Sequence, residues 1–320
     1  MNNKNIICAF FLFLITSSLF SNYNRRVSHW QQMSLEEKVA QMIMVRISGN
    51  YYQSDSYYRN KVDNLIKNKK IGGLITFGGS LHGTFYNIQA FQKLSSTPLL
   101  IAADYERGVG QWLDGATLFP PNMAFAATED PKLCFKQGEI TAKEARAVGV
   151  HIALSPVMDV NNNPENPIIN FRSYSDNPNT VSEFGLEFIN GCQSNNMYAC
   201  IKHFPGHGNT STDSHTSLPV ISGTRDQLDS LELKPFKDAV ESGVKMVMVG
   251  HIAMPGLDDP NVPASHSYKI CTTLLREEWG FDGILITDAL EMKGISKYTW
   301  AGESAVRAVE AGSDIILLPL

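Results

Sequence analysis

The sequence contains few cysteines, no tract of basic residues and no dinucleotide-binding motif after its first predicted strand. The cysteine spacings match no zinc site and no C-x-x-C motif occurs, so we expect no metal ion in this protein. A net charge of −5 and a pI near 5.9, without a cluster of Lys and Arg, argue against nucleic acid as a partner. The absence of G-x-G-x-x-G argues against a dinucleotide-binding fold.

The N-terminus carries a short apolar segment. Lys4 precedes an apolar stretch at residues 6–15, and small polar residues follow it. A membrane-spanning helix needs about 20 apolar residues, so this stretch predicts a signal peptide, residues 1–21, and export to the periplasm or the medium without stable membrane insertion. An uncleaved membrane anchor is the alternative. Cleavage would remove Cys8, and we interpret the remaining cysteines as core residues: Cys134, Cys192, Cys200 and Cys271.

Short apolar runs alternate with helical patterns along the rest of the chain. A helix is predicted to begin with Ser34 as its N-cap and Glu37 at the third helical position. Eight runs have the length and composition of buried strands: residues 42–47, 71–77, 99–104, 151–157, 199–203, 245–250, 283–287 and 314–318. The helical patterns include residues 57–69, 131–147, 178–194, 225–242, 268–279 and 299–311.

This alternation predicts an α/β fold, a (β/α)₈ TIM-like barrel over residues 30–320. Strands that alternate with helices indicate a parallel sheet, and eight such units favour a closed barrel over an open doubly wound sheet. The last run ends close to Leu320, where a complete barrel would add another helix. We therefore expect either a fragment of a longer protein, with a further C-terminal domain, or a barrel completed by other sequence.

The loop at residues 202–219 is the strongest candidate for a site of chemistry. Lys202 and His203 end a predicted strand, and the Pro and Gly residues that follow prevent a helix. Asp213 and His215 lie two residues apart on the far side of the loop. An Asp that orients an imidazole is a general acid–base unit. The alternative is a tight loop whose histidines cap backbone groups, and the density of ionisable residues favours catalysis.

Other polar residues follow the predicted strands. Active sites of (β/α)₈ barrels lie at the carboxyl ends of the strands, so these residues are candidates for the same site. Asp288 directly follows the seventh run, where it would be either a nucleophile in the mouth of the barrel or a helix N-cap. The remaining candidates follow the third, fourth and sixth runs: Asp104, Glu106, Asp159, Arg172 and His251.

The segment KHFPGHGNTSTDSH, residues 202–215, resembles the signature loop of the β-N-acetylglucosaminidases of glycoside hydrolase family 3. In that family the Asp-His pair of the loop is the acid/base and an Asp at the end of the seventh strand is the nucleophile. The resemblance therefore implies that Asp288 is the nucleophile, that His215 is the acid/base and that Asp213 orients it. It also implies that no metal or organic cofactor is needed.

The resemblance extends to substrate contacts. Asp104, in IAADYERGVGQW, matches the family's Asp-x-Glu segment, whose first Asp binds sugar hydroxyls. Arg172, Lys202 and His203 likewise match sugar-binding residues. Family members usually carry Arg eight residues after the Asp, whereas this chain has Trp112. Either Trp112 stacks on a sugar face instead, or the loop is shifted. We interpret four further residues as supporting ones: Glu106, Asp159, His207 and His251.

The resemblance therefore implies a retaining β-N-acetylhexosaminidase that removes terminal β-linked N-acetylglucosamine from glycans such as peptidoglycan or chitin fragments. A phosphorylase that passes the sugar to phosphate is one alternative, and a noncatalytic sugar-binding barrel of a larger protein is another. A β-glucosidase of the same broad family fits less well, because those enzymes take their acid from a Glu in a later domain and lack the Asp-Ser-His loop.

Overall fold

The structure is a computed structural model that describes residues 30–211, 218–292, 295 and 299–319. The chain divides into two units, Met1–Gln41 and Met42–Leu320. The first unit contains α2 (Leu35–Gln41), where Ser34 N–H donates to Glu37 over 3.0 Å and Glu37 N–H donates to Ser34 Oγ over 3.2 Å. This reciprocal capping confirms the predicted helix start. The predicted signal peptide lies outside the described residues.

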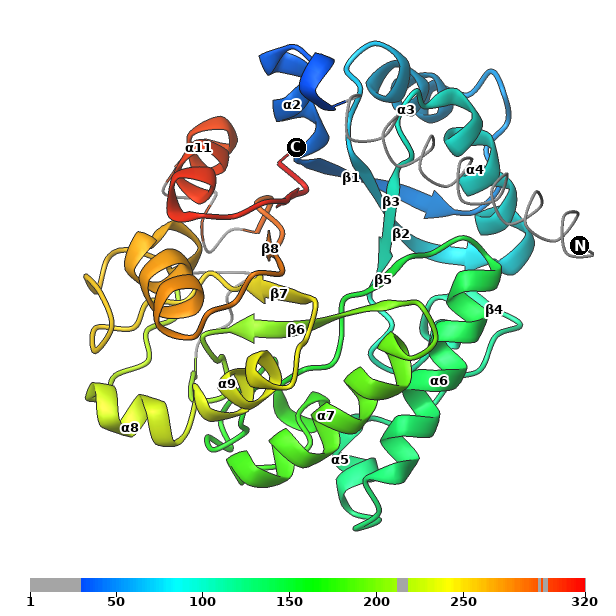
Figure 1. Ribbon diagram of the computed structural model, residues 1–320. Coiled ribbons are helices and arrows are strands. Elements are labelled where there is room, and N and C mark those ends of the chain that lie inside the picture. Colours follow the sequence, from blue (N-terminus) through cyan, green and yellow to red (C-terminus); the bar gives the residue numbers. More distant parts are fainter. Residues whose placement is uncertain (1–29, 212–217, 293–294, 296–298, 320) are drawn as a thin grey trace, which may run out of the picture. The chain divides into compact units, whose positions relative to one another are not determined.

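The second unit is built on parallel strands in the order β8-β7-β6-β5-β3-β2-β1-β9, with the short β4 paired to β2 (Figure 1). A parallel bridge joins Ile286 of β8 to Ile315, just before β9, so the sheet curls into a nearly closed barrel. The strands are β1 (Ile43–Gly49), β2 (Gly73–Ser80), β3 (Leu100–Ala103), β4 (Leu113–Asp114), β5 (Ile152–Ala153), β6 (Tyr198–Phe204), β7 (Met246–Val249), β8 (Ile284–Thr287) and β9 (Ile316–Leu317). Each predicted apolar run overlaps one strand of the barrel, which confirms the (β/α)₈ prediction.

Helices connect successive strands on the outside of the barrel (Figure 1). They are α3 (Tyr57–Lys67), α4 (Leu81–Leu94), α5 (Asn122–Ala126), α6 (Lys132–Ala147), α7 (Pro178–Gln193), α8 (Arg225–Ser230), α9 (Lys234–Glu241), the π-helical segment η4 (Lys269–Glu278) and α11 (Ala301–Ala311). The single helix predicted at 225–242 is wrong, because the chain forms α8 and α9 there. Pro235 lacks an N–H and would clash with a carbonyl one turn earlier in a continuous helix. Neither α4 nor β4 was predicted.

Strand β7 shows how an uninterrupted apolar run serves two cores. Met246 and Met248 belong to the cluster inside the barrel, whereas Val247 and Val249 belong to the cluster between the strands and the helices. Successive side chains of a strand point to opposite faces, and both faces of a parallel sheet are covered. The four described cysteines are buried and free, as predicted for core residues: Cys134, Cys192, Cys200 and Cys271.

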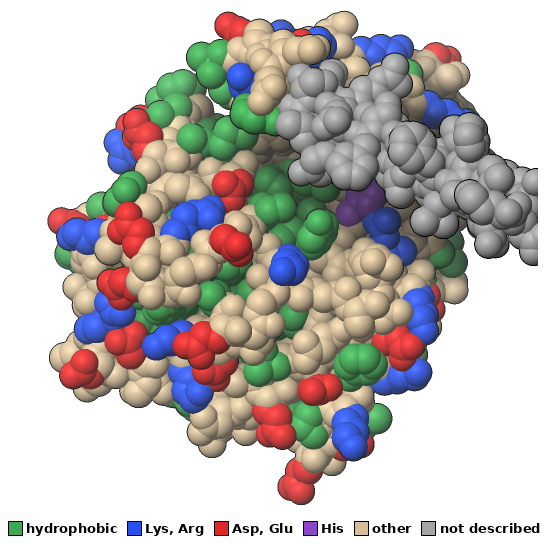
Figure 2. Space-filling model, in the orientation of Figure 1, with side chains coloured by type: hydrophobic (Ala, Val, Ile, Leu, Met, Phe, Trp, Pro, Cys, Tyr) green, Lys and Arg blue, Asp and Glu red, His purple; other side chains and the backbone are tan. Residues whose placement is uncertain are grey.

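The surface in Figure 2 carries charges of both signs. Lys, Arg, Asp and Glu side chains are interspersed around the margin of this face, and hydrophobic side chains gather nearer its middle (Figure 2). Within the described part of the chain, no helix has the length and apolarity needed to cross a membrane.

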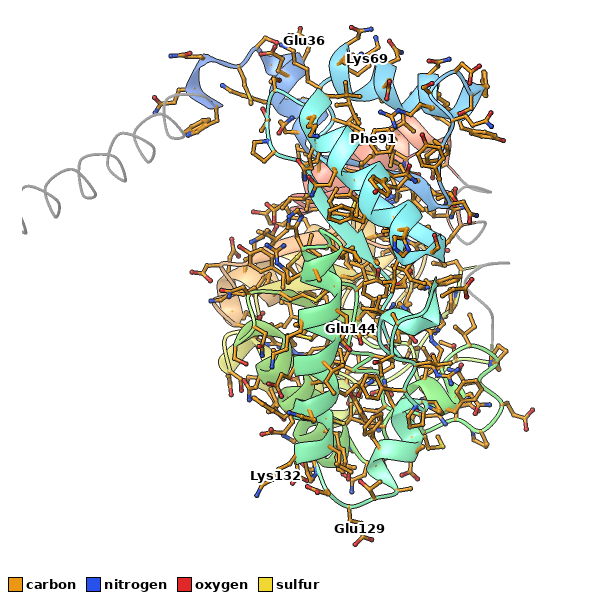
Figure 3. All side chains as sticks on the ribbon, turned by 90° about the vertical axis from the view of Figure 1, so that its right-hand side faces the viewer. Glu36, Lys69, Phe91, Glu129, Lys132 and Glu144 are labelled. Carbon is orange, nitrogen blue, oxygen red and sulfur yellow. The ribbon has the colours of Figure 1, made fainter. Side chains whose placement is uncertain are left out.

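The loop after β3 is fastened to α6. Glu144, labelled on α6 in Figure 3, accepts hydrogen bonds from the backbone N–H and hydroxyl of Thr117 over 3.0 and 2.6 Å. Gln137, also on α6, donates to the carbonyl oxygen of Glu106 over 3.1 Å. These bonds fix the loop that carries Glu106 and Trp112 at the carboxyl end of the barrel.

Candidate active site

A cavity of about 500 Å³ lies at the carboxyl ends of the strands. The structure brings together five of the residues predicted for the site in its walls: Asp104, Arg172, Lys202, His203 and Asp288. The predicted acid/base residues Asp213 and His215 lie outside the described residues. Lining residues that the sequence analysis did not single out include Arg46, Phe77, Arg107, Phe171 and Glu291.

Lys202 is the centre of a charged cluster on the floor of the cavity. Its Nζ lies 2.7 Å from Asp104 Oδ1 and 2.7 Å from Glu106 Oε1, and its side chain is only 4% exposed. Burial opposes the charge of the ammonium group, but the two carboxylates outweigh burial and hold the pKa of Lys202 above its usual range. The cluster is therefore charged at neutral pH and offers donors and acceptors to the hydroxyls of a sugar.

Arg172 closes the cluster from the loop after β5. Its Nε and Nη2 donate to the two carboxylate oxygens of Glu106 over 2.9 and 2.7 Å. Burial alone would raise the pKa of Glu106, yet Lys202 and Arg172 together hold that pKa far below its usual range. Glu106, interpreted from the sequence as a supporting residue, thus lines the cavity and holds both cations of the cluster in place.

Asp159 positions the histidines of the loop after β6. Its carboxylate is fully buried and accepts from His203 Nδ1 over 2.7 Å, from His203 N–H over 3.2 Å and from His207 N–H over 2.7 Å. Burial would raise the pKa of Asp159, but the charge and hydrogen bonds of His203 outweigh it and lower the pKa. Asp159 therefore acts through its neighbours, orienting the His203 ring whose Nε2 lies 3.5 Å from Arg172 Nη2.

Asp288 follows β8 directly and lines the same cavity. Its backbone N–H donates to the carbonyl of Val249 over 2.9 Å, and its carboxylate accepts from the N–H of Ala289 over 2.7 Å. Burial would raise the pKa of Asp288, but His203, His251 and the Ala289 N–H lower it below the usual range. Asp288 is thus ionised at neutral pH, as a carboxylate nucleophile must be.

His251 supports the backbone next to Asp288. Its Nε2 lies 3.2 Å from the carbonyl oxygen of Ala289, which can only accept, so this nitrogen donates. Nδ1 lies 2.8 Å from the hydroxyl of Ser265. Burial lowers the pKa of His251, and its two hydrogen bonds hold the chain after β8 in place.

Strands β1 and β2 supply a wall of the cavity in which a cation lies beside aromatic rings. Arg46 forms an ion pair with Glu291, and its guanidinium lies 4.8 Å from the centre of the Phe77 ring. The ring of Phe77 in turn meets Trp112 edge-on, with 5.6 Å between ring centres. A charged residue inside the apolar run at 42–47 was the signal that would have placed Arg46 in the cavity.

No group of three or more His, Cys, Asp or Glu side chains in residues 30–211, 218–292 and 299–319 is arranged to hold a metal ion. The ionisable groups of the cavity instead pair with one another, as in the cluster around Lys202.

The sequence and the fold together match one family. Residues 34–320 match the family described as "Glycosyl hydrolase family 3 N terminal domain". The chain belongs to this family. Beta-hexosaminidase A of Pseudoalteromonas piscicida is 36% identical to this chain over 289 residues, which cover 81% of this chain and 48% of the relative.

Solved structures share the fold, among them one described as a member of glycoside hydrolase family 3. A beta-N-acetylglucosaminidase from Paenibacillus sp. str. FPU-7 superimposes with a TM-score of 0.84 at 38% identity, over 89% of this chain and 55% of that one. The beta-glucoside phosphorylase BglX superimposes with a TM-score of 0.84 at 27% identity, over 90% and 53%. The chain spans about half the length of these relatives. The resemblance to glycoside hydrolase family 3 inferred from the loop at 202–215 is confirmed.

Proposed function

We propose that this family 3 chain is a retaining β-N-acetylhexosaminidase that removes terminal β-linked N-acetylglucosamine from glycans such as peptidoglycan or chitin fragments. The observation that carries the proposal is the position of Asp288, an ionised carboxylate in the same cavity as the cluster of Asp104, Lys202 and Arg172. The names of the relatives, a beta-hexosaminidase and a beta-N-acetylglucosaminidase, support the same reaction.

In the proposed mechanism the carboxylate of Asp288 attacks the anomeric carbon and forms a covalent bond to the sugar. The bond to the leaving oxygen breaks at the same time, and protonated His215 gives its proton to that oxygen. Neutral His215 then takes a proton from water, whose oxygen attacks the anomeric carbon and frees Asp288. Asp213 orients the ring of His215, and its charge favours the protonated form.

The charged cluster would hold the terminal sugar during both steps. Asp104 accepts hydrogen bonds from hydroxyls, while Lys202 and Arg172 donate to them. His203, fixed through Nδ1 by Asp159, presents Nε2 on the cavity side. Rigid groups of this kind keep the anomeric carbon near Asp288, which is how binding energy is converted into rate.

Release of p-nitrophenol from its β-N-acetylglucosaminide by the purified chain tests the proposal. Asp288→Asn is expected to abolish turnover, since it removes the nucleophile but keeps the shape of the side chain. Asp282→Asn is the matched control, because Asp282 is exposed and lies before β8, at the opposite end of the strand. Turnover that survives Asp288→Asn would refute the assigned nucleophile.

A phosphorylase is the second candidate function, and the likeness to a beta-glucoside phosphorylase favours it. Phosphate would then replace water in the second step. Stimulation of turnover by phosphate, with the sugar 1-phosphate as product, would move the assignment from hydrolase to phosphorylase. A folded chain that binds N-acetylglucosamine but releases no product would instead indicate a noncatalytic sugar-binding barrel.

The apolar stretch at residues 6–15 has the length of the apolar region of a signal peptide, and on this ground we also propose that the protein is exported. N-terminal sequencing of protein recovered outside the cytoplasm should find a chain that starts after residue 21 or close to it. An intact N-terminus in a membrane fraction would support an uncleaved anchor.

A further inference from the structure

The cavity has a charged floor and an aromatic rim. Lys202 and Glu106 on the floor are 4% and 10% exposed, respectively. Two aromatic residues that line the same cavity are far more open to solvent, with Trp112 36% and Phe171 53% exposed. Exposed aromatic side chains at the edge of a polar pocket commonly mark a contact with a ligand.

Trp112 is held rigidly in place. It directly precedes β4, which pairs with β2 beyond the end of the barrel strand, and Phe77 packs edge-on against its ring. Within the same loop, Gly110 N–H donates to the carbonyl of Thr117 over 2.9 Å. A ring fixed in this way loses little conformational entropy when a ligand covers it.

The position of Phe171 is fixed through Arg172, the next residue in the chain. Phe171 lies in the single turn Asn170–Arg172, and the guanidinium of Arg172 is bound to Glu106 by two hydrogen bonds. The loop that carries Phe171 is therefore tied to the floor of the cavity, although the phenyl ring itself is exposed.

A β-linked pyranose has polar edges and apolar faces. The hydroxyls of N-acetylglucosamine point outward around the ring, whereas its C–H bonds cover both faces. Charged groups therefore suit the edges and aromatic rings suit the faces. A terminal sugar that engages Asp104 and Lys202 on the floor would leave the next sugar of the chain at the rim, beside Trp112.

We propose that Trp112 and Phe171 form a subsite for the second sugar of a β-linked N-acetylglucosamine oligosaccharide. The proposal rests on the proposed function and names its substrate class, short chito-oligosaccharides. Trp112 stacks on one face of the second ring and holds the scissile bond over Asp288. Phe171 contacts the same sugar from the loop after β5.

Two substrates separate this subsite from the binding of the terminal sugar. Diacetylchitobiose has a second ring, whereas methyl β-N-acetylglucosaminide has none, and both leaving groups are alkyl oxygens. Trp112→Ala should lower the ratio of kcat/KM for chitobiose to that for the methyl glycoside by about tenfold. Phe171→Ala should lower it less, Trp112→Phe should restore most of it, and the exposed Trp300 provides the control Trp300→Ala.

A binding measurement makes the test independent of turnover. In Asp288→Asn protein, chitobiose should change the intrinsic tryptophan fluorescence, and Trp112→Phe should abolish that change. A ratio that stays constant in Trp112→Ala overturns the subsite. If both kcat/KM values fall by the same factor, Trp112 instead contacts the terminal sugar. Chitobiose that binds through Trp112 without turnover would support the subsite and refute the hydrolase, and chitobiose that neither binds nor reacts would refute both.

Discussion

Arg172 and Glu106 join two loops of the barrel through a bidentate pair, with donor–acceptor distances of 2.9 and 2.7 Å. Glu106 comes from the loop after β3, and Arg172 comes from the loop after β5, which is next to β3 in the sheet. Because Lys202 shares the same carboxylate, one buried acidic residue aligns two cations of the cavity. This relationship makes Glu106 the residue on which the geometry of the charged floor depends.

Arg172→Met should therefore destabilise the protein as well as weaken sugar binding. Removal of the guanidinium leaves a buried carboxylate with Lys202 as its remaining cation, so the free energy of unfolding should fall by about 3 kcal/mol. Urea denaturation measures this change. The control is Arg225→Met, which removes an exposed arginine paired with Asp229 and Glu278 and should change stability by less than about 1 kcal/mol. Equal effects of the two substitutions would contradict the role of the pair.

Lys202→Met should lower activity and move its acid limb. Loss of a charged hydrogen bond to the sugar should reduce kcat/KM at neutral pH by about 10- to 100-fold. Lys202 also contributes to the lowered pKa values of Glu106 and Asp288, so both values should rise in the variant. These carboxylates would then take up protons at higher pH, and the acid limb of kcat/KM should shift upward. Lys143→Met, at an exposed pair with Glu139, should leave the profile in place.

His207→Gln should weaken the dependence of stability on pH. Burial, and secondarily the nearby His203, lowers the pKa of His207 to about 4, whereas an unfolded His has a pKa of about 6.5. Between these values the unfolded chain binds a proton that the folded chain does not, so stability falls as the pH drops. This one group should remove roughly 2 kcal/mol between pH 7 and pH 5.

Unfolding free energies measured in urea at the two pH values test this prediction. Gln cannot titrate, so the difference between the two values should shrink in His207→Gln. Some difference should remain, because burial also lowers the pKa values of His151 and His266 to about 4. His82→Gln, on the exposed surface of α4, is the control. An unchanged difference in His207→Gln would show that the pKa of His207 is not lowered in the folded state.

Gly208→Ala should disturb the loop that leads towards Asp213 and His215. A Cβ at this position would lie 1.6 Å from the carbonyl oxygen of Val160, and a backbone atom cannot move aside as a side chain can. The loop must shift, with a loss of about 3 kcal/mol in stability and a fall in activity. At Gly223 the nearest atom to an added Cβ is a side-chain atom of Leu228 at 3.3 Å, so Gly223→Ala should have a much smaller effect in thermal denaturation.

Much of the fold could be predicted because its signals are local. The run 245–250 contains β7, and all four residues of that strand are apolar and buried. The prediction of one helix from 225 to 242 is wrong, because Pro235 is suited to the first turn of a helix but not to its interior, so α9 starts there as a separate helix. Strand β4 has two residues and depends on pairing with β2, which no local pattern reveals.

The sequence by itself determined that three ionisable residues reach the mouth of the barrel. Asp104, Lys202 and Asp288 each follow an apolar run, and the carboxyl ends of parallel strands meet at one end of a barrel. Only the tertiary structure decided which side chains pair there. Glu106 meets Arg172 and Asp159 meets His203 across 66 and 44 positions of the chain. Such partners are set by the register and closure of the sheet. The local sequence around each partner reveals neither the register nor the closure.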